Sequence, residues 1–160
     1  MSTKTAKIPQ YWLMKSEPDC YSIYDLKQDT VEPWDGTRNY QVRNMMRDDM
    51  KVGDLVLFYH SNTKEIGCVG TMKIVKKAYP DPTQFDPKSE HPDPKSDPEN
   101  PRWLCVDVRF QSKFPRTVTL AEIKIDNAFD TMPLVHKGNR LSVMPIKKAH
   151  FHKIVKMAQR

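Results

Sequence analysis

The apolar positions of this chain fall into short runs that predict β-strands. Residues 11–14 and 55–59 are apolar without a break, which is typical of strands covered on both faces. The segment 104–111 alternates between apolar and polar residues, as expected for a half-buried strand. A further run contains Gly67 and Gly70, which indicate a bulge or a close backbone approach. The predicted strands are residues 11–15, 54–60, 66–78, 103–112 and 142–146.

Four other segments have the three- and four-residue spacing of amphipathic helices. The clearest spans Thr37–Asp49, where Val42, Met45, Met46 and Met50 form one apolar stripe. The remaining three are Ser22–Gln28, Thr119–Asn127 and Lys147–Gln159, with Ser22 and Thr119 as expected N-caps.

Strands in the middle and helices towards the ends predict an α+β fold, a curved or barrel-like sheet with helices packed outside it. A length of 160 residues fits one domain. We therefore expect a single domain over residues 1–160, with residues 1–9 as a flexible N-terminal tail.

Charge is unevenly distributed along the chain. The net charge is +6, but the segment 79–101 has six acidic residues, two lysines and seven prolines, and so carries −4 against +10 for the rest. Such a basic remainder is typical of proteins that bind polyanions, although surplus lysine can equally serve solubility. We predict that Arg43, Arg47 and nearby lysines form a basic rim around a pocket. The proline-rich loop should lie off that surface.

Several classes of protein are disfavoured. Cys20, Cys68 and Cys105 are far apart and form no C-x-x-C pair, which argues against a zinc site and dithiol chemistry. No apolar run approaches the roughly 20 residues of a membrane span. The N-terminus lacks the apolar segment of a signal peptide, and a cytoplasmic location is expected. We expect no metal, no cofactor, no membrane and no obligate protein partner.

Candidate binding residues cluster where predicted strands end or helices begin, the places where a scaffold presents functional groups. Trp34 lies in a polar loop and could stack on a flat ligand, with a role as a core anchor equally open. His60 and Ser61 cannot easily form a catalytic pair, because adjacent residues of a strand point to opposite faces. The full set of candidate binding residues is Lys15, Ser16, Trp34, Asn39, Tyr40, Arg43, Tyr59, His60, Ser61, Asn62 and Arg140.

Several motifs, in one order, resemble the EVE domain family. They are KSEP at 15–18, WDGTRNYQVRN at 34–44, LFYHSN at 57–62, YPDPTQFD at 79–86, PRW at 101–103 and RLSVMP at 140–145. The resemblance covers the chain from about Tyr11 to the C-terminal helix. It implies a PUA-like mixed β-barrel of about five to six strands with surrounding helices. That superfamily includes domains that read methylated adenine in RNA or methylated cytosine in DNA.

These observations predict a non-catalytic module that binds DNA or RNA and holds one modified base, for example a modified cytosine, in an aromatic and polar pocket. Base recognition needs only stacking and hydrogen bonds, whereas the sequence offers no convincing activated nucleophile or metal site. Two alternatives stay open: an enzyme or enzyme accessory that acts on a nucleic-acid base, and a sensor of a small, nucleoside-like molecule.

Overall fold

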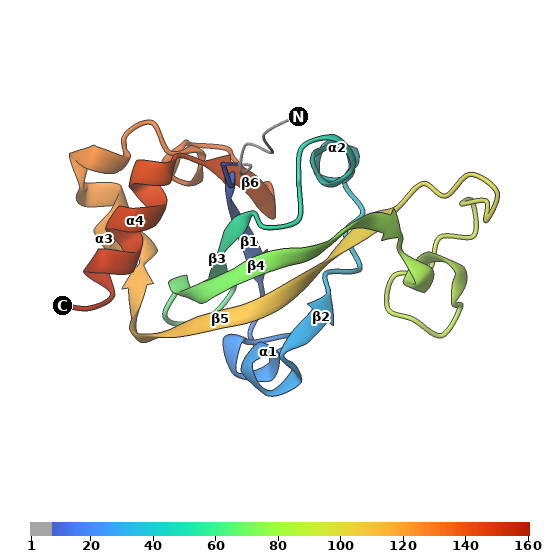
Figure 1. Cartoon of the computed structure of the whole chain (residues 1–160), viewed down its shortest axis with the longest axis horizontal. Helices are drawn as coiled ribbons and strands as arrows, with labels where there is room; N and C mark the ends of the chain where they lie inside the picture. Colours follow the sequence, from blue (N-terminus) through green and yellow to red (C-terminus); the bar gives the residue numbers. More distant parts are fainter. Residues whose placement is uncertain (1–7) are drawn as a thin grey trace, which may run out of the picture.

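The computed structural model describes residues 8–160 and contains one six-stranded mixed sheet in the order β2-β5-β4-β3-β1-β6 (Figure 1). Strand β1 pairs in parallel with β3, and the other neighbours are antiparallel. The strands are β1 (Tyr11–Ser16), β2 (Val31–Pro33), β3 (Leu55–His60), β4 (Gly67–Pro80), β5 (Leu104–Thr119) and β6 (Val143–Ile146). Residues 1–7 of the expected N-terminal tail lie outside the described residues.

Within residues 8–160, three α-helices and three short 3-10 helices connect the strands, and a fourth α-helix follows β6. The predicted N-caps Ser22 and Thr119 are confirmed at helix α1 (Ile23–Asp29) and helix α3 (Leu120–Ile125), and each forms a capping box. The others are α2 (Tyr40–Asp48), α4 (Lys148–Met157), η1 (Pro82–Phe85), η2 (Asn127–Phe129) and η3 (Pro133–Val135). Helix α2 starts three residues later than predicted, because the Asn39 side chain caps it by accepting from Val42 N at 3.0 Å.

Two hydrophobic clusters cover the two faces of the sheet. Alternate residues of β1 serve them: Tyr11 and Leu13 pack with α4, while Trp12 and Met14 pack with α1 and α2. This double burial explains the unbroken apolar runs of β1 and β3. Figure 1 shows α3 and α4 at one end of the sheet, with the segment that follows β4 projecting at the other.

All five predicted strands and the hairpin of β3 and β4 are confirmed, with two corrections. The short strand β2 was not predicted. The sheet is also not closed into the expected barrel, since β2 and β6 are its two edges. Both edge strands are short and contain a proline, Pro33 or Pro145, which cannot donate to a further strand.

The predicted role of the strand glycines is confirmed. A side chain at Gly67 or Gly70 would collide with the backbone of β5, and the pairing of β4 with β5 shifts register between Cys68 and Gly70. Among residues 8–160, no helix has the length and apolar character needed to cross a bilayer.

Candidate binding site

A cleft of about 640 Å³ opens where the ends of β1 and β2 meet the loops before α2 and after β4. We call it the base cleft. Four of the candidate residues line it together, namely Lys15, Ser16, Trp34 and Asn39. The other lining residues are Cys20, Tyr21, Glu32, Pro33, Asp35, Gly36, Thr37, Arg38, Thr83, Glu90, His91 and Ser142.

Trp34 is both a wall of this cleft and part of the core. The Trp34 backbone N donates to Val106 O at 2.7 Å, which fixes Trp34 beside β5. Its ring meets Phe58 edge to face, with centroids 5.4 Å apart, and 8% of the residue is exposed. The role of core anchor is therefore confirmed, and stacking on a ligand stays a prediction that the position of Trp34 in the cleft wall allows.

Ser16 and Lys15 come from the end of β1. Ser16 Oγ donates to Tyr21 O at 2.7 Å, so its hydrogen is engaged and its oxygen remains free to accept from a ligand. Lys15 N donates to Ser142 O at 2.8 Å, which ties β1 to the segment before β6. The Lys15 side chain is half-buried, and this desolvation lowers its pKa.

Two carboxyl groups of the base cleft have raised pKa values. Partial desolvation raises the pKa of Glu32, and its neighbour Asp29 raises it further, against the hydrogen bond from Tyr21. Desolvation also raises the pKa of Asp35, with the negative charge of Asp81 as the next cause. Both groups therefore take up a proton more readily than ordinary carboxyls, which lets them act as acceptors or donors towards a flat polar ligand.

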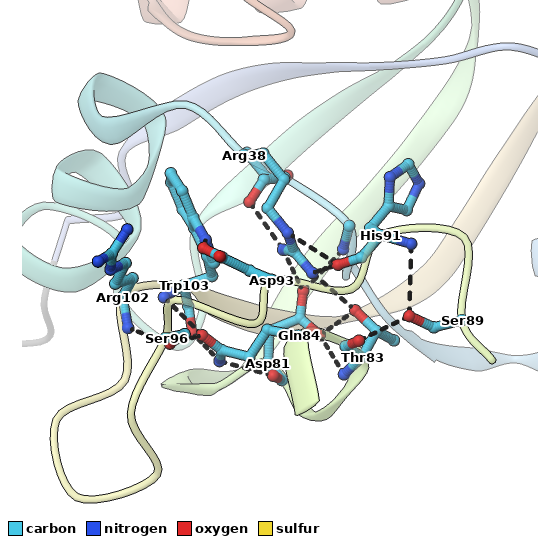
Figure 2. Close-up of polar contacts among 12 residues, drawn as sticks. Arg38, Asp81, Thr83, Gln84, Ser89, His91, Asp93, Ser96, Arg102 and Trp103 are labelled. Carbon is cyan, nitrogen blue, oxygen red and sulfur yellow. Dashed lines mark hydrogen bonds and ion pairs between the residues drawn. The ribbon is translucent and has the colours of Figure 1, made fainter. Parts of the chain in front are cut away.

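Asp81, which is fully buried, joins the two loops that flank the cleft (Figure 2). Its carboxylate accepts from Gly36 N at 2.8 Å, from Arg38 Nη1 at 3.0 Å, and from Thr83 N and Oγ1 at 2.8 and 2.6 Å. Burial opposes its ionisation, but these bonds together lower the pKa of Asp81. Asp81 is thus a charged tie between the Trp34–Arg38 segment and the loop after β4.

The proline-rich loop is held by hydrogen bonds to the buried side-chain amide of Gln84, as Figure 2 shows. Gln84 Nε2 donates to Asp81 O and Trp103 O, while its Oε1 accepts from Ser96 Oγ and Trp103 N. Arg38 Nη2 donates to His91 O at 2.6 Å, which brings the loop against the cleft. The prediction that this loop lies off the binding surface is wrong, because Thr83, Glu90 and His91 form part of the cleft wall.

Tyr40 and Arg43 belong to a stack beside the cleft. Tyr40 lies on Trp103 with ring centroids 4.8 Å apart, Arg43 covers Tyr40, and Arg38 covers the other ring at 5.7 Å. Arg43 contacts Tyr40 and Arg47 pairs with Asp48 at 2.8 Å, so neither lines the cleft itself, and a basic rim around its mouth stays a prediction. The stack anchors the loop after β4 to α2.

The remaining candidates lie away from the base cleft. His60 is buried and its Nε2 accepts from Ile23 N at 3.1 Å, which satisfies the first N–H of α1, and burial lowers its pKa. Ser61 and Asn62 form the turn after β3, with Asn62 Nδ2 donating to Glu17 Oε1 at 3.3 Å. Arg140 is exposed before β6, and Tyr59 lines a neighbouring groove.

Sequence reasoning missed several residues of the cleft. Glu32 was missed because three-residue β2 has no alternation long enough to be recognised, and Tyr21 was missed in the turn between β1 and α1. Asp35 and Arg38 lie within a motif already noted. They were missed because the helix was expected to begin at Thr37, whereas the chain before Tyr40 is a loop along the cleft. Ser142 stands two residues from the chosen Arg140 and faces the cleft instead.

Comparison with known proteins agrees over nearly the whole chain. The EVE domain model matches residues 10–157. Human thymocyte nuclear protein 1 is 40% identical over 172 residues, which cover 96% of this chain and 76% of that protein. The relative from Danio rerio is 44% identical, with 93% and 73% covered.

Solved structures show the same architecture. The crystal structure of the human protein in complex with DNA containing 5-methylcytosine has a TM-score of 0.85 and 41% identity, covering 95% of this chain and 99% of that one. A protein from Pseudomonas putida has a TM-score of 0.89 and 44% identity, covering 92% and 99%. The chain has their α+β, PUA-like fold and belongs to the EVE domain family.

Proposed function

We propose that this chain is a non-catalytic module that binds nucleic acid and holds one modified base, a 5-methylcytosine in DNA, in the base cleft. The observation that carries this proposal is the placement of two carboxyl groups with raised pKa values, Glu32 and Asp35, beside the wall formed by Trp34. The crystallised human relative, which holds DNA containing 5-methylcytosine, supports the choice of ligand.

The edge of cytosine fits these groups. Its 4-amino group is a donor that carboxylates accept in protein–DNA complexes, and a protonated carboxyl can donate to the neighbouring ring nitrogen. Glu32 or Asp35 supplies this contact in our proposal, while Ser16 Oγ offers a further acceptor. The ring of the base lies against Trp34, and the 5-methyl group adds apolar contact.

The energies are compatible with a base taken out of its stack. Extruding a paired base costs a few kcal/mol. Stacking on an aromatic side chain returns about 1–3 kcal/mol, and a good pair of hydrogen bonds to a base edge adds about 1–3 kcal/mol of discrimination. Phosphate contacts outside the cleft supply the rest of the affinity.

Two potential nucleophiles in the cleft, Ser16 and Cys20, lack the partners that would activate them, which supports a binding role. Ser16 Oγ donates to a backbone carbonyl instead of a base. Desolvation and the negative charge of Glu17 raise the pKa of the Cys20 thiol, which lowers its thiolate fraction. We further propose one domain over residues 1–160 and a reducing, cytoplasmic setting, in line with the free thiols of all three cysteines.

A comparison of three pyrimidines tests the proposal. Short DNA oligonucleotides that differ only in one cytosine, 5-methylcytosine or thymine are titrated against the protein at one stated salt concentration. The 5-methylcytosine strand should bind most tightly, because thymine has the methyl group but replaces the 4-amino donor with a carbonyl. Either Glu32→Gln or Asp35→Asn should reduce the preference for 5-methylcytosine over thymine by about tenfold, since one of the two replaces the carboxyl at the base edge with an amide.

Asp49→Asn is the matched control, because Asp49 is exposed at the end of α2 and does not line the cleft. An RNA strand of the same sequence, measured beside the DNA strand, shows whether the protein prefers deoxyribose or ribose. Equal affinity for all three pyrimidines would refute base reading. Recovery of an altered base after incubation would instead favour the enzyme, and binding of the free nucleoside as tight as that of the strand would favour the small-molecule sensor.

A further inference from the structure

A second cavity of about 950 Å³ lies next to the base cleft, and Lys15 lines both. We call it the lysine groove. Its walls come from the end of β1, from α3 and from the turn after η3. The remaining lining residues are Tyr59, Leu120, Lys124, Asp130, Leu134, Val135, His136, Lys137, Gly138 and Asn139.

The lysine groove differs in charge from the base cleft. Lys15, Lys124 and Lys137 face it with a single carboxylate, that of Asp130. The base cleft instead has three carboxylic residues, Glu32, Asp35 and Glu90. None of the three lysines takes part in an ion pair with another residue in the range 8–160.

Two polar groups of the lysine groove, on Lys15 and Tyr59, are free to bind a ligand. Tyr59 lines the groove although only 2% of it is exposed, and its hydroxyl forms no hydrogen bond within residues 8–160. Lys15 Nζ lies 5.6 Å from the centre of the Tyr59 ring. The Tyr59 hydroxyl is not among the fully buried polar atoms of residues 8–160, so it reaches the groove and can donate to a ligand oxygen there, as can the half-buried ammonium group of Lys15.

We propose that the lysine groove is a phosphate-binding subsite, which holds a backbone phosphate next to the nucleotide whose base occupies the base cleft. This inference rests on the proposed function. The phosphate oxygens accept from Lys15 Nζ and from the Tyr59 hydroxyl, which burial keeps in its protonated, donating form. Lys124 and Lys137, exposed at the mouth, add charge that neutralises the strand on its way in.

The shared lysine explains why the two cavities should act on one strand. A nucleotide joins its base to its phosphate through one sugar, so the two groups must occupy adjoining sites. Lys15 stands where these sites meet. Phosphate contacts position a strand without reading its sequence, so the groove should set affinity while the base cleft sets preference.

The test uses Lys124→Ala/Lys137→Ala, which leaves every base-cleft residue intact, together with the 5-methylcytosine and cytosine strands. We expect weaker binding of both strands and an unchanged ratio between them. The slope of log affinity against log salt should become shallower by about 0.7–0.9 for each lost phosphate contact. The matched control is Lys51→Ala/Lys77→Ala, since both lysines are exposed and line neither cavity.

A second measurement locates the phosphate. Each phosphate beside the 5-methylcytosine is replaced in turn by a neutral methylphosphonate. One replacement should weaken binding to the natural protein by about tenfold and have much less effect on Tyr59→Phe, which has already lost its bond to that phosphate. Tyr59→Phe keeps the buried ring and so preserves the fold.

The outcomes separate the two proposals. If the natural protein fails to prefer 5-methylcytosine, the proposed function fails, whatever the lysine variants do. If that preference holds but the salt slope of Lys124→Ala/Lys137→Ala equals that of the control, the phosphate subsite is overturned. An acidic peptide that binds the groove without competing with the strand would overturn it as well.

Discussion

Replacing Asp81 with alanine is expected to lower the free energy of unfolding by about 3–5 kcal/mol, the usual cost of breaking a buried ion pair from one side. The carboxylate is completely buried, and its partner Arg38 is only 21% exposed. The substitution would leave Gly36 N and Thr83 N without their acceptor as well. Urea unfolding followed by tryptophan fluorescence measures the loss.

Asp48→Ala provides the control for this result. Asp48 also pairs with an arginine, but the side chains of Arg47 and Asp48 are 50% and 54% exposed. Exposed pairs contribute at most about 1 kcal/mol, so this variant should unfold almost like the natural protein. Equal losses in the two variants would show that Asp81 is not the tie between the loops that the structure indicates. Faster proteolysis within residues 82–102 of Asp81→Ala would place the damage in the proline-rich loop.

Trp34→Ala is expected to weaken binding of the 5-methylcytosine strand by about tenfold to a hundredfold, since stacking on an aromatic side chain contributes about 1–3 kcal/mol. It should also reduce the free energy of unfolding by about 3–5 kcal/mol, because Trp34 packs on Phe58 in the core. Titrations by fluorescence polarisation, made at a temperature where the variant is still folded, measure the first effect.

Two further variants separate binding from stability. Trp34→Phe keeps an aromatic face and should bind more tightly than Trp34→Ala. Met46→Ala removes a fully buried side chain from the same hydrophobic cluster, but Met46 does not line the base cleft. It should lose roughly 2–5 kcal/mol of stability and keep its affinity. If Met46→Ala binds as weakly as Trp34→Ala, the stacking role of Trp34 is refuted.

The strands and helices could be predicted because their signals are local. The four apolar residues at the start of β1 pack alternately into the two hydrophobic clusters. A strand buried on both faces needs such an unbroken apolar run. Ser22 and Thr119 mark the starts of their helices, because each forms a capping box with a residue only three positions later. Edge strand β2 has only three residues and depends on its pairing with β5, so its own sequence carries little of the signal.

The site was predicted less completely because its contacts join distant segments. Ser16 and Lys15 were chosen from their position after an apolar run, and Trp34 was chosen as an aromatic residue in a polar loop. The proline-rich loop was misplaced, because its bonds to Arg38 and Gly36 span about fifty positions in sequence and leave no periodic pattern. Its six acidic residues argued against a place near nucleic acid. One of them, the buried Asp81, forms an ion pair with Arg38. Net charge describes a segment's average and not the partners of each residue.

The most direct test of the central claim is a crystal structure of this protein with a DNA oligonucleotide that contains a single 5-methylcytosine. The account predicts that this base is turned out of the strand, lies against Trp34 with its 4-amino group at Glu32 or Asp35, and remains chemically intact. A base still stacked in the strand, with DNA bound elsewhere and the base cleft empty, would contradict it.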